Sequence, residues 1–313
     1  MCAQNEQTGN FSIDKDGNIV SLIIKRGVSY DAIEYLKNNS KEQIDLFLID
    51  GEYSDLEFLI TYKNRVRSLR TSGVSLLDWN SINRIKDIVA FVGCEGIKYK
   101  GLDASAHKSL RWLDCYGDNL IENRLGDFSS LRSIRLRKAK STKLNILKNI
   151  SNLEHLSLVY SRNLVSLSGL EQFNKLKFLE LESNNKLQCI ESLDNCVKLS
   201  TLIIVKNHKL SDYTVISKLA NINELILSAP KHSVDSLSWV RSLTKLRLFR
   251  FDIGITDGDV KHLYELRNLE HVYFRQKRNL NVKLKDIENY LLKNESEDSI
   301  KNRWTRFPHF TEA

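Results

Sequence analysis

The side chains best suited to catalysis or metal binding are the 7 histidines and 5 cysteines, and their spacing supports neither chemistry. A zinc site needs Cys or His ligands in closely spaced pairs, and the cysteines form no such pair. The sequence also has no glycine-rich phosphate loop, no Gly-x-Ser-x-Gly and no His-Glu-x-x-His. The sequence therefore predicts no enzyme, no metal site and no cofactor.

The elements that position the other polar residues are near-copies of one sequence motif. LEHLSLVYS, LKFLELESN and LSTLIIVKN begin at Leu153, Leu176 and Leu199. Each reads Leu-x-x-Leu-x-Leu, with Ile for the last leucine in the third copy, and two of them end in Asn, at Asn184 and Asn207. The second and third apolar residues lie two apart, so on a strand they share one face and point into a core. Asn can hydrogen-bond the turning backbone that follows.

This motif, with an asparagine that recurs at its end to form an asparagine ladder, resembles the leucine-rich-repeat family. Most intervals between the first apolar positions are 21 to 23 residues. This spacing resembles that of the compact repeats in internalins and phosphatase-regulatory proteins, and the chain resembles the stand-alone bacterial type. The resemblance implies a curved α/β solenoid of about 12 repeats, with a parallel β-sheet on the concave face and short helices or 3-10 turns on the convex face. The first apolar positions are Ile19, Ile44, Val66, Ile88, Leu110, Leu131, Leu153, Leu176, Leu199, Ile222, Leu243 and Leu269.

Three segments are expected along the chain: an N-terminal cap (1–18), the repeats (19–280) and a C-terminal cap (281–313). Phe11–Leu22 has two alternating runs around Asp-Gly, which predicts a hairpin because Gly accepts positive φ. Leu284, Ile287 and Leu291 recur at helical spacing and predict a capping helix, followed by an aromatic tail.

The early repeats carry features that the central ones lack. Tyr30–Leu36 and Asp55–Tyr62 are predicted to be helical, with Ser54 and Glu57 as a capping box for the second. Ile44–Asp50 is apolar on both faces, with Phe47 and Ile49 expected in the core. Leu46 and Leu48 would then lie on the opposite face, either covered or in a binding patch.

The predicted site is a partner-binding surface on the concave face, where alternate strand residues point outward. Isolated charges there are expected to be merely solvated, but large aromatic residues are not explained by solvent. Trp, Tyr and Arg carry most of the binding energy at protein interfaces. The predicted partner-binding residues are Trp112, Asp114, Tyr116, Arg135, Arg137, His155, Tyr160, Phe178, Glu180, Glu182, Lys245, Arg247, Phe249, Tyr273 and Arg275.

The charge balance leaves two kinds of partner open. Lys+Arg 47 against Asp+Glu 39 gives a formal net charge of +8, which could attract nucleic acid or an acidic protein. The basic residues are spread over many repeats, and Glu180 and Glu182 interrupt them. No known nucleic-acid-binding motif is present. A protein partner is therefore favoured, with nucleic acid as the alternative.

No apolar run is long enough to cross a membrane, and the N-terminus lacks the pattern of a signal peptide, although an export signal of another kind stays open. Unpaired cysteines fit a reducing compartment. We therefore expect a cytoplasmic protein, monomeric when free, that binds a protein without catalysis. The finer hypothesis is an immunity-type inhibitor of a toxin or effector; the alternative is a scaffold or regulatory subunit of a cellular enzyme.

Overall fold

The computed structural model describes residues 6–8, 11–16, 18–85, 87–93, 102–117 and 124–292. They form two compact units, one within residues 1–137 and the other within residues 138–309, with the last four residues of the chain outside the described part. No helix in the described part is long and apolar enough to span a membrane.

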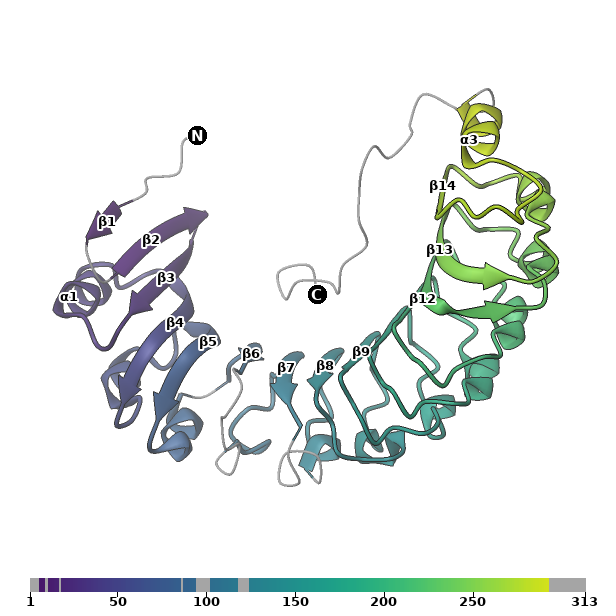
Figure 1. Ribbon diagram of the computed structural model, residues 1–313. Helices are drawn as coiled ribbons and strands as arrows, with labels where there is room; N and C mark the ends of the chain where they lie inside the picture. Colours follow the sequence, from purple (N-terminus) through teal and green to yellow (C-terminus); the bar gives the residue numbers. More distant parts are fainter. Residues whose placement is uncertain are drawn as a thin grey trace. The chain divides into compact units, whose positions relative to one another are not determined.

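The first unit begins with the antiparallel strands β1 (Glu6–Thr8), β2 (Phe11–Asp16) and β3 (Ile19–Lys25) and continues as a parallel sheet (Figure 1). The hairpin prediction is confirmed, because Asp16 pairs with Ile19 across its turn. The strands that follow are β4 (Gln43–Tyr53), β5 (Val66–Leu76), β6 (Ala90–Val92), β7 (Trp112–Tyr116) and β8 (Ser133–Arg137). The helical connections are α1 (Tyr30–Asn38), η1 (Glu57–Tyr62), η2 (Trp79–Arg84) and η4 (Leu125–Asp127), where η marks a 3-10 helix.

The second unit is a parallel sheet in which each strand from β9 to β13 is followed by a short 3-10 turn, as predicted for the central repeats, and the last strand is followed by an α-helix (Figure 1). The strands are β9 (His155–Val159), β10 (Phe178–Glu182), β11 (Thr201–Val205), β12 (Glu224–Val234), β13 (Leu248–Ile255) and β14 (His271–Phe274). The helical segments are η5 (Leu144–Leu147), η6 (Leu170–Gln172), η7 (Glu191–Asn195), η8 (Thr214–Lys218), η9 (Ser238–Ser242), η10 (Lys261–Glu265) and α3 (Leu284–Leu292).

The core of the second unit is built from stacked columns of equivalent residues. Leu156, Leu179 and Leu202 are direct cross-strand partners on β9, β10 and β11, and all three are fully buried. Each column exists because the same position recurs in every repeat, so a residue packs on its own counterpart. A solenoid held in this way buries apolar surface between neighbouring turns only.

The asparagine ladder is present at the two predicted positions. Asn184 and Asn207 are buried, and the side-chain amide of each donates to a strand carbonyl of the preceding repeat, Leu158 and Leu181 respectively. The side-chain oxygen of Asn207 accepts from the backbone N–H of Asn184 at 2.9 Å, and that of Asn184 accepts from Ser161 at 2.9 Å. These bonds satisfy backbone groups that the turn would otherwise bury without partners.

The predicted register of Ile44–Asp50 is wrong. Leu46 and Leu48 are fully buried in the core, whereas Phe47 and Ile49 are half-buried on the opposite face. The reason is that β4 already starts at Gln43, so the two-residue alternation runs on from Ile44. In the central repeats the strand starts two residues after the first apolar position. The alternation of core-facing and outward-facing residues is therefore shifted by one residue relative to β4.

The remaining helix predictions are partly correct. α1 covers the predicted Tyr30–Leu36, but the second segment is a 3-10 helix that starts at Glu57. The predicted capping box is wrong, because the backbone N–H of Glu57 donates to Asp55 Oδ1 at 2.8 Å and the Ser54 hydroxyl donates to Asp55 Oδ2 instead of capping the helix.

The C-terminal capping helix is confirmed as α3. Ile287 and Leu291 are buried where this helix packs against β14 and η10. The predicted aromatic tail, Ser296–Ala313, lies outside the described residues.

Candidate partner-binding surface

In each unit, one side of the sheet packs on the core and the helical turns, and the other side does not. We call this other side the strand face of that unit. Along β8, for example, Ile134 and Leu136 are fully buried, whereas Arg135 and Arg137 are only half-buried on the strand face. Alternate residues of every strand build this face because side chains alternate along a strand.

The strand face of the first unit is centred on one ionic and aromatic group. Asp114 is buried and accepts a hydrogen bond from Arg137 Nη2 at 2.5 Å. The Arg137 guanidinium also lies 5.4 Å from the centroid of the Tyr116 ring. Arg135 is the direct cross-strand partner of Asp114. The sequence predicted that these four residues lie on one face of the sheet, and the structure has them on one face.

A second ionic group lies in the same unit, at the start of β4 and β5. Asp45 is buried and accepts two hydrogen bonds from Arg67, at 3.0 and 2.8 Å, and one from the Ser68 hydroxyl at 2.7 Å. Burial lowers the pKa of Arg70, while the carboxylates of Asp45 and Asp114 oppose that change. The face therefore holds guanidinium groups in a partly desolvated setting, where an added carboxylate would interact strongly.

Apolar side chains flank this charged region, and sequence reasoning missed them. Ile23 and Phe47 are cross-strand partners on β3 and β4, and Ile49 lies two residues further along β4; all three are half-buried. The corrected register of β4 is the signal that finds them. Trp112, in contrast, is only 4% exposed and offers little surface to a partner.

The strand face of the second unit is acidic in its middle. Glu180 and Glu182 lie on β10 and Glu224 on β12, and all three are half-buried. Ile203 on β11 is the cross-strand partner of Glu180 on one side and of Ile226 on β12 on the other. The Ser157 hydroxyl donates to Glu180 Oε2. Carboxylates beside apolar side chains suit a basic protein segment and disfavour the phosphates of nucleic acid.

The far end of the same face carries an exposed aromatic residue with a cation over it. Tyr273 on β14 is 51% exposed, and the Arg250 guanidinium lies 5.1 Å from its ring centroid. Arg275, just beyond the strand, is exposed. Tyr273 and Arg275 are among the predicted partner-binding residues, and Arg250 lies beside Tyr273 on the neighbouring strand β13.

The other end of that face holds the predicted His155, Tyr160 and Phe178. Phe178 is buried, and its ring meets the half-buried His155 ring edge-on at 6.3 Å between centroids. Tyr160 is 46% exposed, with a φ of 56° in the turn after β9. Of these three, Tyr160 offers a partner the most surface.

The predicted register of the repeat at β13 is wrong, and three predicted residues move with it. Phe249 is fully buried, 4.8 Å from Phe251 between ring centroids, so it belongs to the core. Lys245 and Arg247 precede the strand, and Arg247 is held by Glu270 through bonds of 2.7 and 2.9 Å, which raise its pKa. The repeat starts at Leu246, because Phe249 and Phe251 take the places of leucines.

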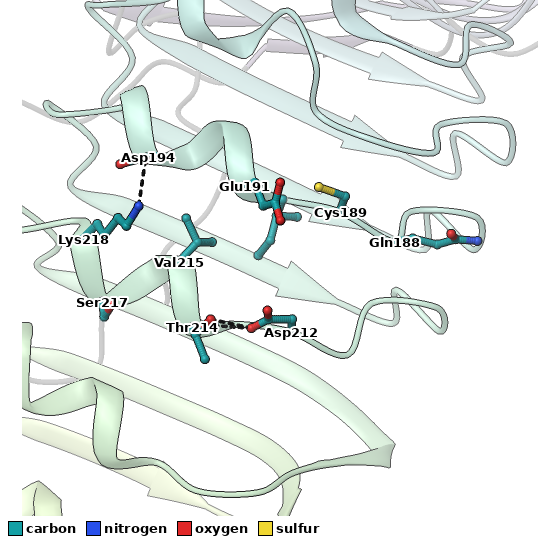
Figure 2. Close-up of a pocket in the computed structure, with 10 residues that line it drawn as sticks. Gln188, Cys189, Glu191, Asp194, Asp212, Thr214, Val215, Ser217 and Lys218 are labelled. Carbon is teal, nitrogen blue, oxygen red and sulfur yellow. Dashed lines mark hydrogen bonds and ion pairs between the residues drawn. The ribbon is translucent and has the colours of Figure 1, made fainter.

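The opposite side of the second unit has a cavity of about 510 Å³ between η7 and η8 (Figure 2). Lys218 forms an ion pair with Asp194 at 2.8 Å, and Asp212 accepts from the Thr214 hydroxyl at 2.7 Å. Hydrogen bonds from Thr214 lower the pKa of Asp212. The half-buried Cys189 also lines the cavity. Within the described residues, no cluster of three or more His, Cys, Asp or Glu is placed to hold a metal.

The cysteines should differ sharply in reactivity. Burial raises the pKa of the Cys196 thiol to about 12, so its thiolate should form roughly a thousandfold less often at pH 8 than in an ordinary cysteine. Iodoacetamide on the native protein should therefore modify Cys189 well before Cys196, as peptide mass spectrometry can measure. Equal rates for the two thiols would contradict the packing of η7.

Comparison with solved structures identifies the class of fold. An internalin (inlF) from Listeria monocytogenes aligns with a TM-score of 0.62 and 16% identity over 90% of this chain and 87% of its own. The functional domain of InlJ from the same organism aligns at 0.49 and 17% identity, covering 72% of this chain and 46% of that one. Internalin C2 gives 0.31 and 22% identity over 82% and 80%.

The architecture is thus that of a leucine-rich-repeat solenoid, as the repeats predicted. At this level of identity the likeness concerns the fold. No protein-family model and no curated protein sequence matches the chain.

Proposed function

We propose that the protein is a non-enzymatic binding protein that holds a protein partner on its strand faces. The observation that carries this proposal is the pairing of guanidinium groups with tyrosine rings on both faces, Arg137 with Tyr116 and Arg250 with Tyr273. A ring held by a neighbouring cation loses little conformational freedom when a partner packs on it, which favours binding.

The more specific proposal is an immunity-type inhibitor of a toxin or effector, acting in the cytoplasm as a monomer when free. In support, each face combines opposite charges with apolar side chains, the mixture that gives selective recognition of one protein. Residues 19–280 would be the binding region, between caps formed by 1–18 and 281–313. A scaffold or regulatory subunit is the alternative, and inhibition of the partner separates the two.

A nuclease-treated pull-down from native lysate tests the proposal. The face variant Tyr273→Ala/Arg275→Ala should weaken capture of one dominant protein by at least about tenfold, because exposed Tyr and Arg residues carry much of the energy at interfaces. The variant Tyr116→Ala/Arg135→Ala tests the first unit in the same way. The matched control is Tyr30→Ala/Lys261→Ala, which removes an aromatic ring that is 91% exposed and an exposed cation from α1 and η10.

The outcomes separate the candidate functions. Capture that survives in both face variants would mean that the strand faces are not the site, and capture lost to nuclease would favour nucleic acid. With the partner purified, an inhibitor should block its activity at equimolar ratio, whereas a scaffold should leave it active.

A further inference from the structure

A buried histidine occupies a core position that other repeats fill with apolar residues. His107 is 2% exposed and lies three residues before the first repeat leucine, Leu110. Its carbonyl accepts from Leu110 N at 3.1 Å, the same turn bond that Phe128 makes to Leu131. The equivalent buried residues of the other repeats are Ile85, Phe128, Ile150, Phe173, Cys196, Leu219, Leu243 and Leu266.

Nothing in the described part of the chain satisfies the His107 ring. Neither Nδ1 nor Nε2 has a hydrogen-bond partner there. Burial accordingly lowers the pKa of His107 to about 4, although the carboxylates of Asp103 and Asp87 act in the other direction. Asp103 is itself held by Arg124 at 3.3 Å and by the backbone N–H of Ser105, so its charge is already partly compensated. We call the turn as it stands in the structure the closed turn. In the closed turn a protonated imidazole would be buried without a hydrogen-bond partner.

A cavity lies beside this residue, although both of its ring nitrogens are buried. His107 lines a cavity of about 350 Å³ on the turn side of the first unit, together with Lys108, Asp127 and Ser129. Lys108 disfavours a second positive charge there, and Asp127 favours it. The turn is followed directly by β7, which carries Asp114 and Tyr116 on the strand face.

We propose that protonation of His107 opens the turn that it anchors and loosens β7, so that mild acid weakens whatever partner the first unit holds. This inference rests on the proposed function for its effect on binding, but the opening itself does not. Well above pH 6.5 the imidazole is neutral in both the closed and the open turn, and pH has no effect through it.

The sign of the effect follows from proton binding. Between pH 6.5 and about 4 the open turn binds a proton that the closed turn does not, so stability of the closed turn falls as pH falls. Below about pH 4 both forms are protonated and the loss levels off. From these two pKa values, the opening equilibrium of wild-type protein should rise about 20-fold between pH 7 and pH 5.

Amide hydrogen exchange of the free protein tests this. After correction for the intrinsic pH dependence of exchange, the protection of Leu113 and Cys115 should fall about 20-fold from pH 7 to pH 5 in wild type. It should stay constant in His107→Leu and His107→Phe, two variants that restore residue types found at this position in other repeats. The amides of β10 and β11 serve as the internal control.

Two results would overturn the proposal. Unchanged protection of β7 in wild type would show that Asp103 and Asp127 accommodate the imidazolium in the closed turn. An equal fall in wild type and both variants would assign the effect to other groups. If β7 opens but partner capture at pH 5 matches that at pH 7, the link to binding is wrong while the opening stands.

Discussion

Replacing Phe251 with alanine should lower the free energy of unfolding of the second unit by about 3–5 kcal/mol. The ring is 1% exposed, stacks on Phe274 at 4.9 Å and packs at a tilt against Phe249 at 4.8 Å, measured between centroids. Deleting it leaves a cavity between two repeats, and a solenoid repeat has only its neighbours to close it. Urea unfolding followed by circular dichroism measures the loss.

Tyr273→Ala is the matched control for this prediction. Tyr273 lies on the same strand as Phe274 but points to the strand face, so its loss should cost less than about 1 kcal/mol. Equal costs for the two substitutions would contradict the register of β13 and β14.

Replacing Asn207 with alanine should lower the free energy of unfolding by about 2–4 kcal/mol. Its side chain donates to the carbonyls of Leu181 at 2.8 Å and Val205 at 3.1 Å and accepts from the N–H of Asn184. The variant leaves the backbone N–H of Asn184 and the backbone carbonyl of Leu181 without these partners in a buried turn. A buried polar group without a hydrogen bond lowers the stability of the folded state.

The control for the ladder is Asn223→Ala. Asn223 is exposed, and only its backbone atoms make hydrogen bonds in the described structure. The free energy of unfolding should therefore change by less than about 0.5 kcal/mol. A small effect of Asn207→Ala in the same assay would mean that water replaces the ladder at no cost.

The centre of the array was readable from sequence because its signals agree with one another. Leu153, Leu176 and Leu199 mark three strands of equal length in identical register, and Asn184 and Asn207 fix the turns between them. Local pattern, hydrogen bonding and packing all require the same structure there.

The site was less predictable because orientation depends on where a strand starts. At β13, Leu243-x-x-Leu246-x-Leu248 fits the repeat as well as Leu246-x-x-Phe249-x-Phe251, and only the aromatic stack with Phe274 selects the second. Exposure depends on neighbouring strands as well. For that reason Trp112 faces the predicted side but is nearly covered, which its own repeat could not reveal.

The measurement that tests the central claim most directly is hydroxyl-radical footprinting of the protein with its captured partner. Binding on the strand face should slow the oxidation of Tyr273, which is 51% exposed in the free protein, and leave Tyr30, in α1, at its free rate. Protection of Tyr30, or of Tyr290 in α3, with Tyr273 unchanged would place the partner on the helical side and contradict the account.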